Sequence, residues 1–109
     1  MPPSQRYRSG IVIIVTGSVR VAPESLDDAL ALSLAHVRRS RTEPGCLLHS
    51  VHRDVEDELR LVFLEHWEDR DALATHFAVP ASGEFVTGLG ALATEPPTLE
   101  IYEAERTRL

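Results

Sequence analysis

One glutamate and one histidine stand among apolar residues in the middle of the chain, where they could carry out acid–base chemistry. Glu65 alternates with Leu61, Phe63 and Trp67 along a predicted strand, so it lies on an otherwise apolar face. His76 follows on the inward side of a predicted helix. Imidazole titrates near neutral pH, and a carboxylate beside it can fix its tautomer. We therefore predict His76 as a general base or hydrogen-bond donor and Glu65 as its orienting partner; the alternative is a structural hydrogen bond between strand and helix.

Aromatic residues and one further histidine could line a pocket beside this pair. Trp67 offers a flat wall to an aromatic ligand, although a lone tryptophan at a strand end is equally typical of a core. Phe85 and Phe63 are core residues by type, with a place in a pocket lining as the alternative. His49 could donate a hydrogen bond to a substrate oxygen, or it could be a partly buried structural histidine. These four residues are the predicted substrate-binding set.

The other histidines and the cysteine do not indicate a metal site in the sequence. His49 and His52 are three residues apart, so on a regular strand they point to opposite faces and cannot bind one ion together. His36 stands near the basic end of a predicted helix, where we expect it to be solvated. Cys46 is predicted to be a small buried apolar residue, because no neighbour in the sequence would lower its pKa.

The strand that carries Glu65 is apolar on both faces, since Val62 and Leu64 alternate with the residues on the Glu65 side. A sheet of this kind must be covered twice, and the helices of so short a chain can cover only one face, so we predict a homodimer. The elements follow the order β-α-β-β-α-β, which predicts an α+β, ferredoxin-like antiparallel sheet with helices on one face. The predicted strands span 11–21, 46–54, 59–67 and 98–103, and helices begin after Pro23, Asp69 and Ser82.

Length and composition describe one ordinary globular domain. With 109 residues the chain can bury one core, which we place at 10–105 behind a flexible extension at 1–9. A net charge of −6 argues against a nucleic-acid partner, because phosphate binding needs a basic face. A single cysteine excludes an internal disulfide and fits a reducing compartment. The apolar run 11–15 is too short to span a membrane or to act as a signal, so we expect a cytoplasmic protein without a membrane partner.

Three motifs resemble the antibiotic biosynthesis monooxygenase (ABM) domain. That family shows E-x-G-C-x-x-Y, a later E-x-W, and then A-L-x-x-H. The chain has the corresponding residues at 43–49, 65–67 and 72–76, in the order Glu-Pro-Gly-Cys-Leu-Leu-His, Glu-His-Trp and Ala-Leu-Ala-Thr-His. The likeness extends over roughly residues 11–102.

The resemblance implies a dimeric α+β barrel in which two sheets face each other and each subunit keeps a pocket between its sheet and its helices. It also implies a monooxygenase that needs no cofactor and acts with molecular oxygen on a phenolic, quinol or polyketide-like aromatic substrate. Two differences keep other functions open: His49 replaces the family tyrosine, and the histidine that often precedes Phe85 is absent. The alternatives are a non-catalytic dimeric ligand-binding or stress-response protein, and a non-oxidative isomerase or cyclase that uses the same pocket.

Overall fold

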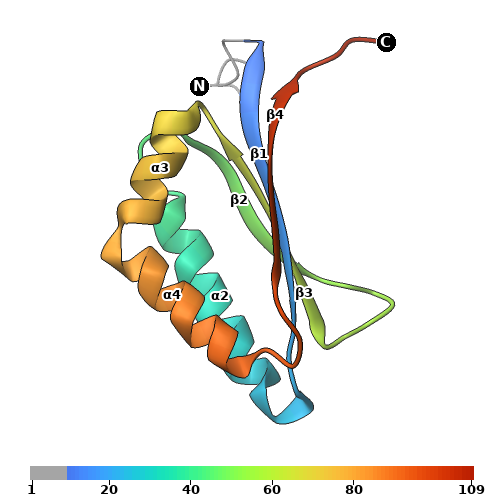
Figure 1. Ribbon diagram of the computed structural model, residues 1–109. Coiled ribbons are helices and arrows are strands. Elements are labelled where there is room, and N and C mark those ends of the chain that lie inside the picture. Colours follow the sequence, from blue (N-terminus) through green and yellow to red (C-terminus); the bar gives the residue numbers. More distant parts are fainter. Residues whose placement is uncertain (1–9) are drawn as a thin grey trace.

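The computed structural model describes residues 10–109, and the predicted extension at 1–9 lies outside them. The elements follow the predicted β-α-β-β-α-β order, with the second helical segment divided into two helices (Figure 1). Their bounds are β1 Ile11–Arg20, η1 Pro23–Ser25, α2 Leu26–Ser40, β2 Cys46–Arg53, β3 Arg60–Trp67, α3 Arg70–Ala78, α4 Pro80–Leu92 and β4 Thr98–Glu105. Among these helices, none is long and apolar enough to cross a membrane.

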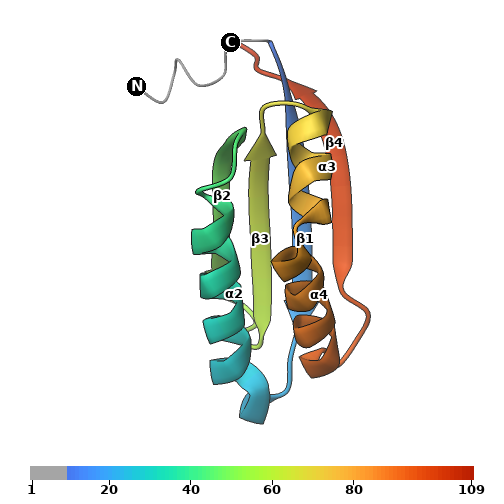
Figure 2. The ribbon, with the colours of Figure 1, turned by 90° about the vertical axis from the view of Figure 1, so that its left-hand side faces the viewer.

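The four strands form one antiparallel sheet in the order β2-β3-β1-β4. Helix α2 lies over the β2 side of this sheet, and α3 and α4 lie over the β1 and β4 side (Figure 2). The predicted ferredoxin-like fold with helices on one face is therefore confirmed. Glu65 of β3 pairs with Val15 of β1 and with His49 of β2, so these three side chains share the face that the helices cover.

A capping aspartate and a proline define the two helices that follow β3. The Asp69 side chain accepts a hydrogen bond from the Ala72 amide at 2.8 Å, as an N-cap residue does. Pro80 then occupies the first turn of α4, where its missing N–H costs nothing, so α3 ends at Ala78 and a new helix begins. We predicted that a helix begins after Ser82, but Ser82 lies inside α4, and its hydroxyl accepts a hydrogen bond from Arg39 of α2. Proline starts this helix without a side-chain cap.

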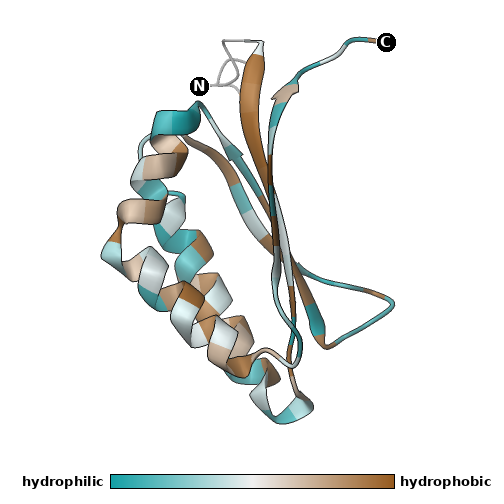
Figure 3. Cartoon of the chain, in the orientation of Figure 1, coloured by the Kyte–Doolittle hydropathy of each residue, from teal (hydrophilic) through white to brown (hydrophobic). Residues whose placement is uncertain are grey.

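The second face of the sheet is left without helices (Figure 1). Its middle carries apolar residues from β1 and β3, namely Ile14, Val62 and Leu64, which are half-buried within a single chain. Figure 3 shows how far the hydrophobic stretch of β1 extends along the strand. This surface is where the sequence predicts a second subunit, and the homodimer remains a prediction.

Gly45 permits the turn between α2 and β2, and its replacement is expected to destabilise the protein. Its φ of 79° lies in the left-handed region, and a Cβ placed there would come 2.5 Å from the Cβ of Ala72. We expect Gly45→Ala to lower the free energy of unfolding by about 2–5 kcal/mol, since a left-handed backbone conformation costs about 1–2 kcal/mol and overpacking about 1–3 kcal/mol. Urea unfolding monitored by circular dichroism measures the change.

Gly83 of α4 is the matched control for Gly45. A Cβ at this position meets no atom within 4 Å. Gly83→Ala should therefore stabilise the protein by about 0.5–1 kcal/mol through its higher helix propensity. Equal effects of the two substitutions would contradict the role assigned to Gly45.

Candidate active site

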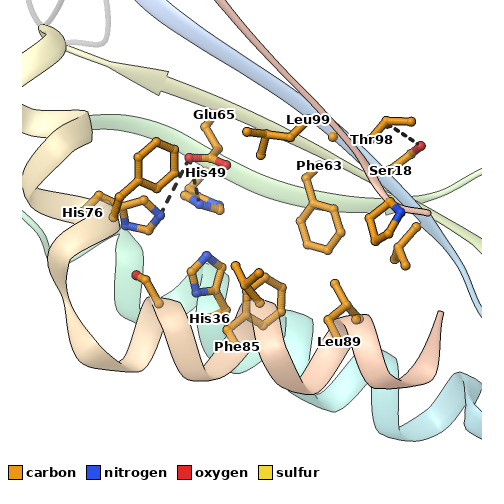
Figure 4. Close-up of a pocket in the computed structure, with 17 residues that line it drawn as sticks. Ser18, His36, His49, Phe63, Glu65, His76, Phe85, Leu89, Thr98 and Leu99 are labelled. Atoms are coloured by element: carbon orange, nitrogen blue, oxygen red, sulfur yellow. Dashed lines mark hydrogen bonds and ion pairs between the residues drawn. The ribbon is translucent and has the colours of Figure 1, made fainter.

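A cavity of about 270 Å³ lies between the sheet and the helices α2, α3 and α4. Most of its wall is apolar, and its ionisable groups gather at one end (Figure 4). The rim is formed partly by Phe77, Val86 and Leu99, which are about half exposed. The lining also includes His36, His49, Phe63, Glu65, His76, Ser82, Phe85 and Leu89. Five of the six predicted site residues therefore line one cavity, and Trp67 is the exception.

His76 is held by a carboxylate that the sequence analysis did not single out. Its Nδ1 donates a hydrogen bond to Oε1 of Glu43 at 2.8 Å. Because a carboxylate can only accept, the proton of the neutral ring lies on Nδ1, and the lone pair is on Nε2. Glu65, the expected partner, lies 3.9 Å from Nε2 and makes no hydrogen bond to the ring. Glu43 was the first residue of the E-x-G-C motif, which was the one available signal for its role.

Glu65 is buried but remains ionised through its neighbours. Its Oε1 accepts a hydrogen bond from the indole N–H of Trp67 at 2.8 Å and lies 3.4 Å from Nε2 of His49. Burial acts to raise the pKa of this carboxyl group, but the interactions with His49, Trp67 and His76 outweigh it and bring the pKa below its ordinary value. A buried negative charge therefore stands at the polar end of the cavity.

His49 is almost completely buried, with 2% of its surface exposed. Its Nε2 lies 3.4 Å from Oε1 of Glu65, which is within ion-pair distance, but neither ring nitrogen has a hydrogen-bond partner among the described residues. Leaving a buried polar group unsatisfied costs about 1–3 kcal/mol, so such groups commonly belong to a binding function. The position of His49 is thus suited to the predicted contact with a substrate oxygen.

His36 was expected to be solvated, and this prediction was wrong. Only 6% of its surface is exposed, because its ring stacks on Phe85 with a centroid distance of 3.9 Å. Arg39 donates a hydrogen bond to its Nδ1 at 2.9 Å. Burial, together with the nearby His49, His76 and Arg39, lowers the pKa of His36 to about 3. We expected solvation because His36 is close to arginines in the sequence, but α4 packs against α2 and covers the His36 ring.

The low pKa of His36 predicts a loss of stability in acid. An unfolded histidine with a pKa near 6.5 binds a proton that the folded one, with a pKa of about 3, does not bind. The stabilising contribution is therefore complete above pH 6.5 and is lost as the pH falls toward 3. Over this range we expect the wild type to lose about 1 kcal/mol per pH unit more than His36→Leu, as measured by urea unfolding.

The exposed His52 provides the control for this pH effect. His52→Gln should keep the pH dependence of the wild type, because this side chain lies on β2 near its exposed end. If His36→Leu and the wild type lost stability in parallel from pH 6.5 to 4.5, the low pKa of His36 would be contradicted.

The aromatic residues of the predicted site divide into two groups. Phe63 and Phe85 line the cavity, and their rings meet edge to face at 5.9 Å. Trp67 is fully buried and does not line the cavity. Its ring packs against His76 at 4.6 Å, and its N–H is used by Glu65. Trp67 therefore packs against His76 and donates a hydrogen bond to Glu65 from within the core, and it does not line the cavity.

Three histidines from different elements converge at the polar end, which we call the histidine cluster: His36 of α2, His49 of β2 and His76 of α3. One potential ligand atom from each lies within 4.8 Å of the others, and all three residues are buried. The sequence analysis predicted no metal site because it considered only the spacing of His49 and His52 along one strand. It could not show that helices would bring two more histidines to His49.

The chain belongs to the antibiotic biosynthesis monooxygenase family, whose profile matches residues 12–88. This range contains the residues that form the polar end of the cavity, and it confirms the resemblance seen in the three motifs.

The chain is also similar to individual proteins and solved structures. The uncharacterized protein sll1783 of Synechocystis is 34% identical over 96 residues, which cover 88% of this chain and 65% of that protein; the chain thus spans less than two thirds of this relative. A crystal structure of an antibiotic biosynthesis monooxygenase is 30% identical, with a TM-score of 0.79 over 86% of this chain and 99% of that chain. A conserved protein from Methanosarcina mazei Go1 has a TM-score of 0.81 at 24% identity over 85% and 92% of the two chains, and it shows the shared fold.

Proposed function

We propose that the protein is a cofactor-independent monooxygenase that oxidises a phenolic, quinol or polyketide-like aromatic compound with molecular oxygen. The observation that carries the proposal is the His76 ring, whose Nδ1–H is bound by Glu43 and whose Nε2 is left to accept a proton beside an apolar cavity. Membership of the ABM family supports the reaction class.

The reaction begins with removal of a proton from the substrate hydroxyl by Nε2 of His76. The resulting phenolate is richer in electrons than the phenol and reduces oxygen more readily. The imidazolium that forms is stabilised by Glu43 at Nδ1 and by the charge of Glu65 at 3.9 Å from Nε2. His49 donates a hydrogen bond to a substrate oxygen, which satisfies its otherwise unpartnered ring.

The substrate supplies all the electrons for the oxidation. In an anthrone-like substrate, the methylene flanked by two aromatic rings gives up two hydrogens and gains one oxygen atom, and the second oxygen atom leaves as water with those two hydrogens. The apolar walls formed by Phe63, Phe85 and Leu89 exclude bulk water from this step. With about 270 Å³, the cavity lies near the lower limit for small-molecule sites and suits a compound of a few rings.

The uncovered sheet face, with Ile14, Val62 and Leu64 at its middle, is the surface proposed to pair with a second copy in a dimeric α+β barrel. Light scattering coupled to size exclusion should give twice the 12.1 kDa mass of the chain. Leu64→Glu is expected to shift the mass to that of one chain, because it places charge in the apolar middle of the interface. A monomeric wild type at micromolar concentration would contradict the dimer.

Oxygen uptake tests the proposed reaction. Untagged protein treated with a chelator is mixed with a panel of hydroquinones and anthrone-like phenols, and the rate is corrected for autoxidation. We expect uptake that is proportional to protein concentration and a product that carries one atom of ¹⁸O from labelled oxygen gas.

Other outcomes of the same panel identify the alternative functions. Conversion of a compound under argon would establish a non-oxidative isomerase or cyclase. A compound that binds and is recovered unchanged after aerobic incubation would favour a ligand-binding protein. Either result would contradict the monooxygenase proposal for the compounds that bind.

A further inference from the structure

The histidine cluster has the donor atoms of a metal site. Its three imidazoles reach the same end of the cavity from α2, β2 and α3, and one potential ligand atom from each lies within 4.8 Å of the other two (Figure 4). Imidazole is a preferred ligand of Zn²⁺, Ni²⁺, Cu²⁺ and Fe²⁺. A modest movement of the side chains would bring the three nitrogens to the mutual spacing that one ion requires.

His49 gives an independent indication that something binds at this point. It is 2% exposed, and both its ring nitrogens lack a hydrogen-bond partner among the described residues. Buried polar atoms in proteins are almost always paired. An ion coordinated by one ring nitrogen of His49 would satisfy this atom directly.

The surroundings of His76 and Glu65 also suit a cation. Metal-binding histidines usually donate their second N–H to a carboxylate, and Nδ1 of His76 donates to Glu43 at 2.8 Å. Glu65 Oε1 lies 3.4 Å from Nε2 of His49 and 3.9 Å from Nε2 of His76, so a negatively charged oxygen stands next to the nitrogens that would coordinate. The open cavity leaves a position for an exogenous ligand.

The positive charge of Arg39 opposes a cation at this site, and its contact with His36 indicates that His36 is the weakest metal ligand of the three. It donates to Nδ1 of His36, which assigns the ring proton to Nε2 and leaves no free lone pair on that ring. Arg39 has another partner within reach: its Nε lies 3.6 Å from Oε2 of Glu43, and both atoms are buried without a hydrogen bond among the described residues. His36 can therefore coordinate once Arg39 turns to Glu43, at some cost in affinity.

We propose that the histidine cluster binds one divalent transition-metal ion of the class that prefers imidazole, such as Zn²⁺ or Co²⁺. His49 and His76 are the principal ligands, His36 is the third and weakest, and Glu65 supplies the compensating charge. The site does not depend on the proposed function. A bound ion would occupy Nε2 of His76 and would inhibit cofactor-independent oxygenation.

The test is a titration of untagged, chelator-treated protein with Co²⁺ and with Zn²⁺, without any substrate. We expect one ion per chain, a dissociation constant of about 10 µM or lower, and the intense visible absorption of cobalt in a four- or five-coordinate site. Proton NMR of the cobalt protein should show shifted exchangeable resonances from coordinated imidazole rings. These spectra of the wild-type protein test for metal binding even if a variant fails to fold.

Variants then locate the site. His49→Ala and His76→Ala should each weaken binding by about 100-fold, and His36→Ala by about tenfold. Arg39→Gln should tighten binding by about tenfold, because it removes a cation and frees His36. The controls His52→Ala and His66→Ala, on residues outside the cavity lining, should leave the constant unchanged.

Two results would overturn the proposal: no binding below about 1 mM, or binding that survives in both His49→Ala and His76→Ala. Because no substrate is present, these results are separate from the oxygen-uptake experiment. Metal binding without oxygenase activity would uphold the metal site and reject the proposed monooxygenase. Oxygenase activity without metal binding would uphold the monooxygenase and reject the metal site.

Discussion

Replacing His76 by glutamine is expected to lower kcat by about 10²–10⁴-fold, the usual contribution of a general base. Glutamine keeps much of the size of the ring and can still bond to Glu43, but it cannot accept the substrate proton. Oxygen uptake with the best substrate of the panel measures the loss. Near-ultraviolet circular dichroism and the melting temperature of the variant establish that the fold is retained. A kcat within threefold of the wild type would contradict the assignment of His76 as the base.

Glu43→Gln tests how the base is positioned. Its second oxygen, Oε2, faces Arg39, which is a donor, so the glutamine oxygen should turn toward Arg39 and its NH₂ toward His76. This arrangement would move the ring proton to Nε2 and remove the lone pair from the cavity. We expect a fall in kcat of about 10²-fold and a changed ¹⁵N tautomer pattern for His76. Glu84→Gln, on the exposed side of α4, is the matched control.

The fold could be predicted because local patterns and global topology agree. Three local patterns each predict one kind of structure: the alternating apolar residues of β3 predict a strand, Asp69 predicts the start of a helix, and Pro44-Gly45 predicts a turn. Together they are consistent with the ferredoxin-like order of elements. The β-bulge between Cys46 and Leu48 could not be read from the sequence, because nothing in this stretch interrupts the strand pattern. Because of this bulge, Cys46 pairs with Trp67 and His49 pairs with Glu65, so Cys46 and His49 lie on the same face of the sheet.

The site could be predicted only where one element determines the direction of a side chain. Period-two alternation placed Glu65 correctly on the covered face of β3. The contact between Glu43 and His76 joins residues 33 positions apart, and the stacking of His36 on Phe85 depends on how α4 packs against α2. Such contacts arise from the relative placement of helices, which hydrophobic periodicity leaves undetermined.

Trp67→Ala is expected to destabilise the protein by about 3–5 kcal/mol, a large part of the 5–15 kcal/mol typical of a small domain. The side chain is fully buried, and it packs in the same cluster as Ile13, Val15 and Leu73. The substitution also removes the only N–H that donates to Glu65 among the described hydrogen bonds, which leaves a buried charge poorly compensated. Urea unfolding at pH 7 measures the change.

Trp67→Phe separates packing from hydrogen bonding. Phenylalanine retains much of the apolar contact but lacks the N–H, so we expect a loss of about 1–3 kcal/mol. Phe77→Ala is the aromatic control, since 46% of Phe77 is exposed, and it should cost less than Trp67→Ala by about 2 kcal/mol or more. If Trp67 contacted substrate instead of supporting Glu65 and His76, both of its variants would chiefly raise KM and leave the urea midpoint near that of the wild type. A core role predicts the opposite: the midpoint falls in both variants, and Trp67→Phe also lowers kcat because Glu65 loses its donor.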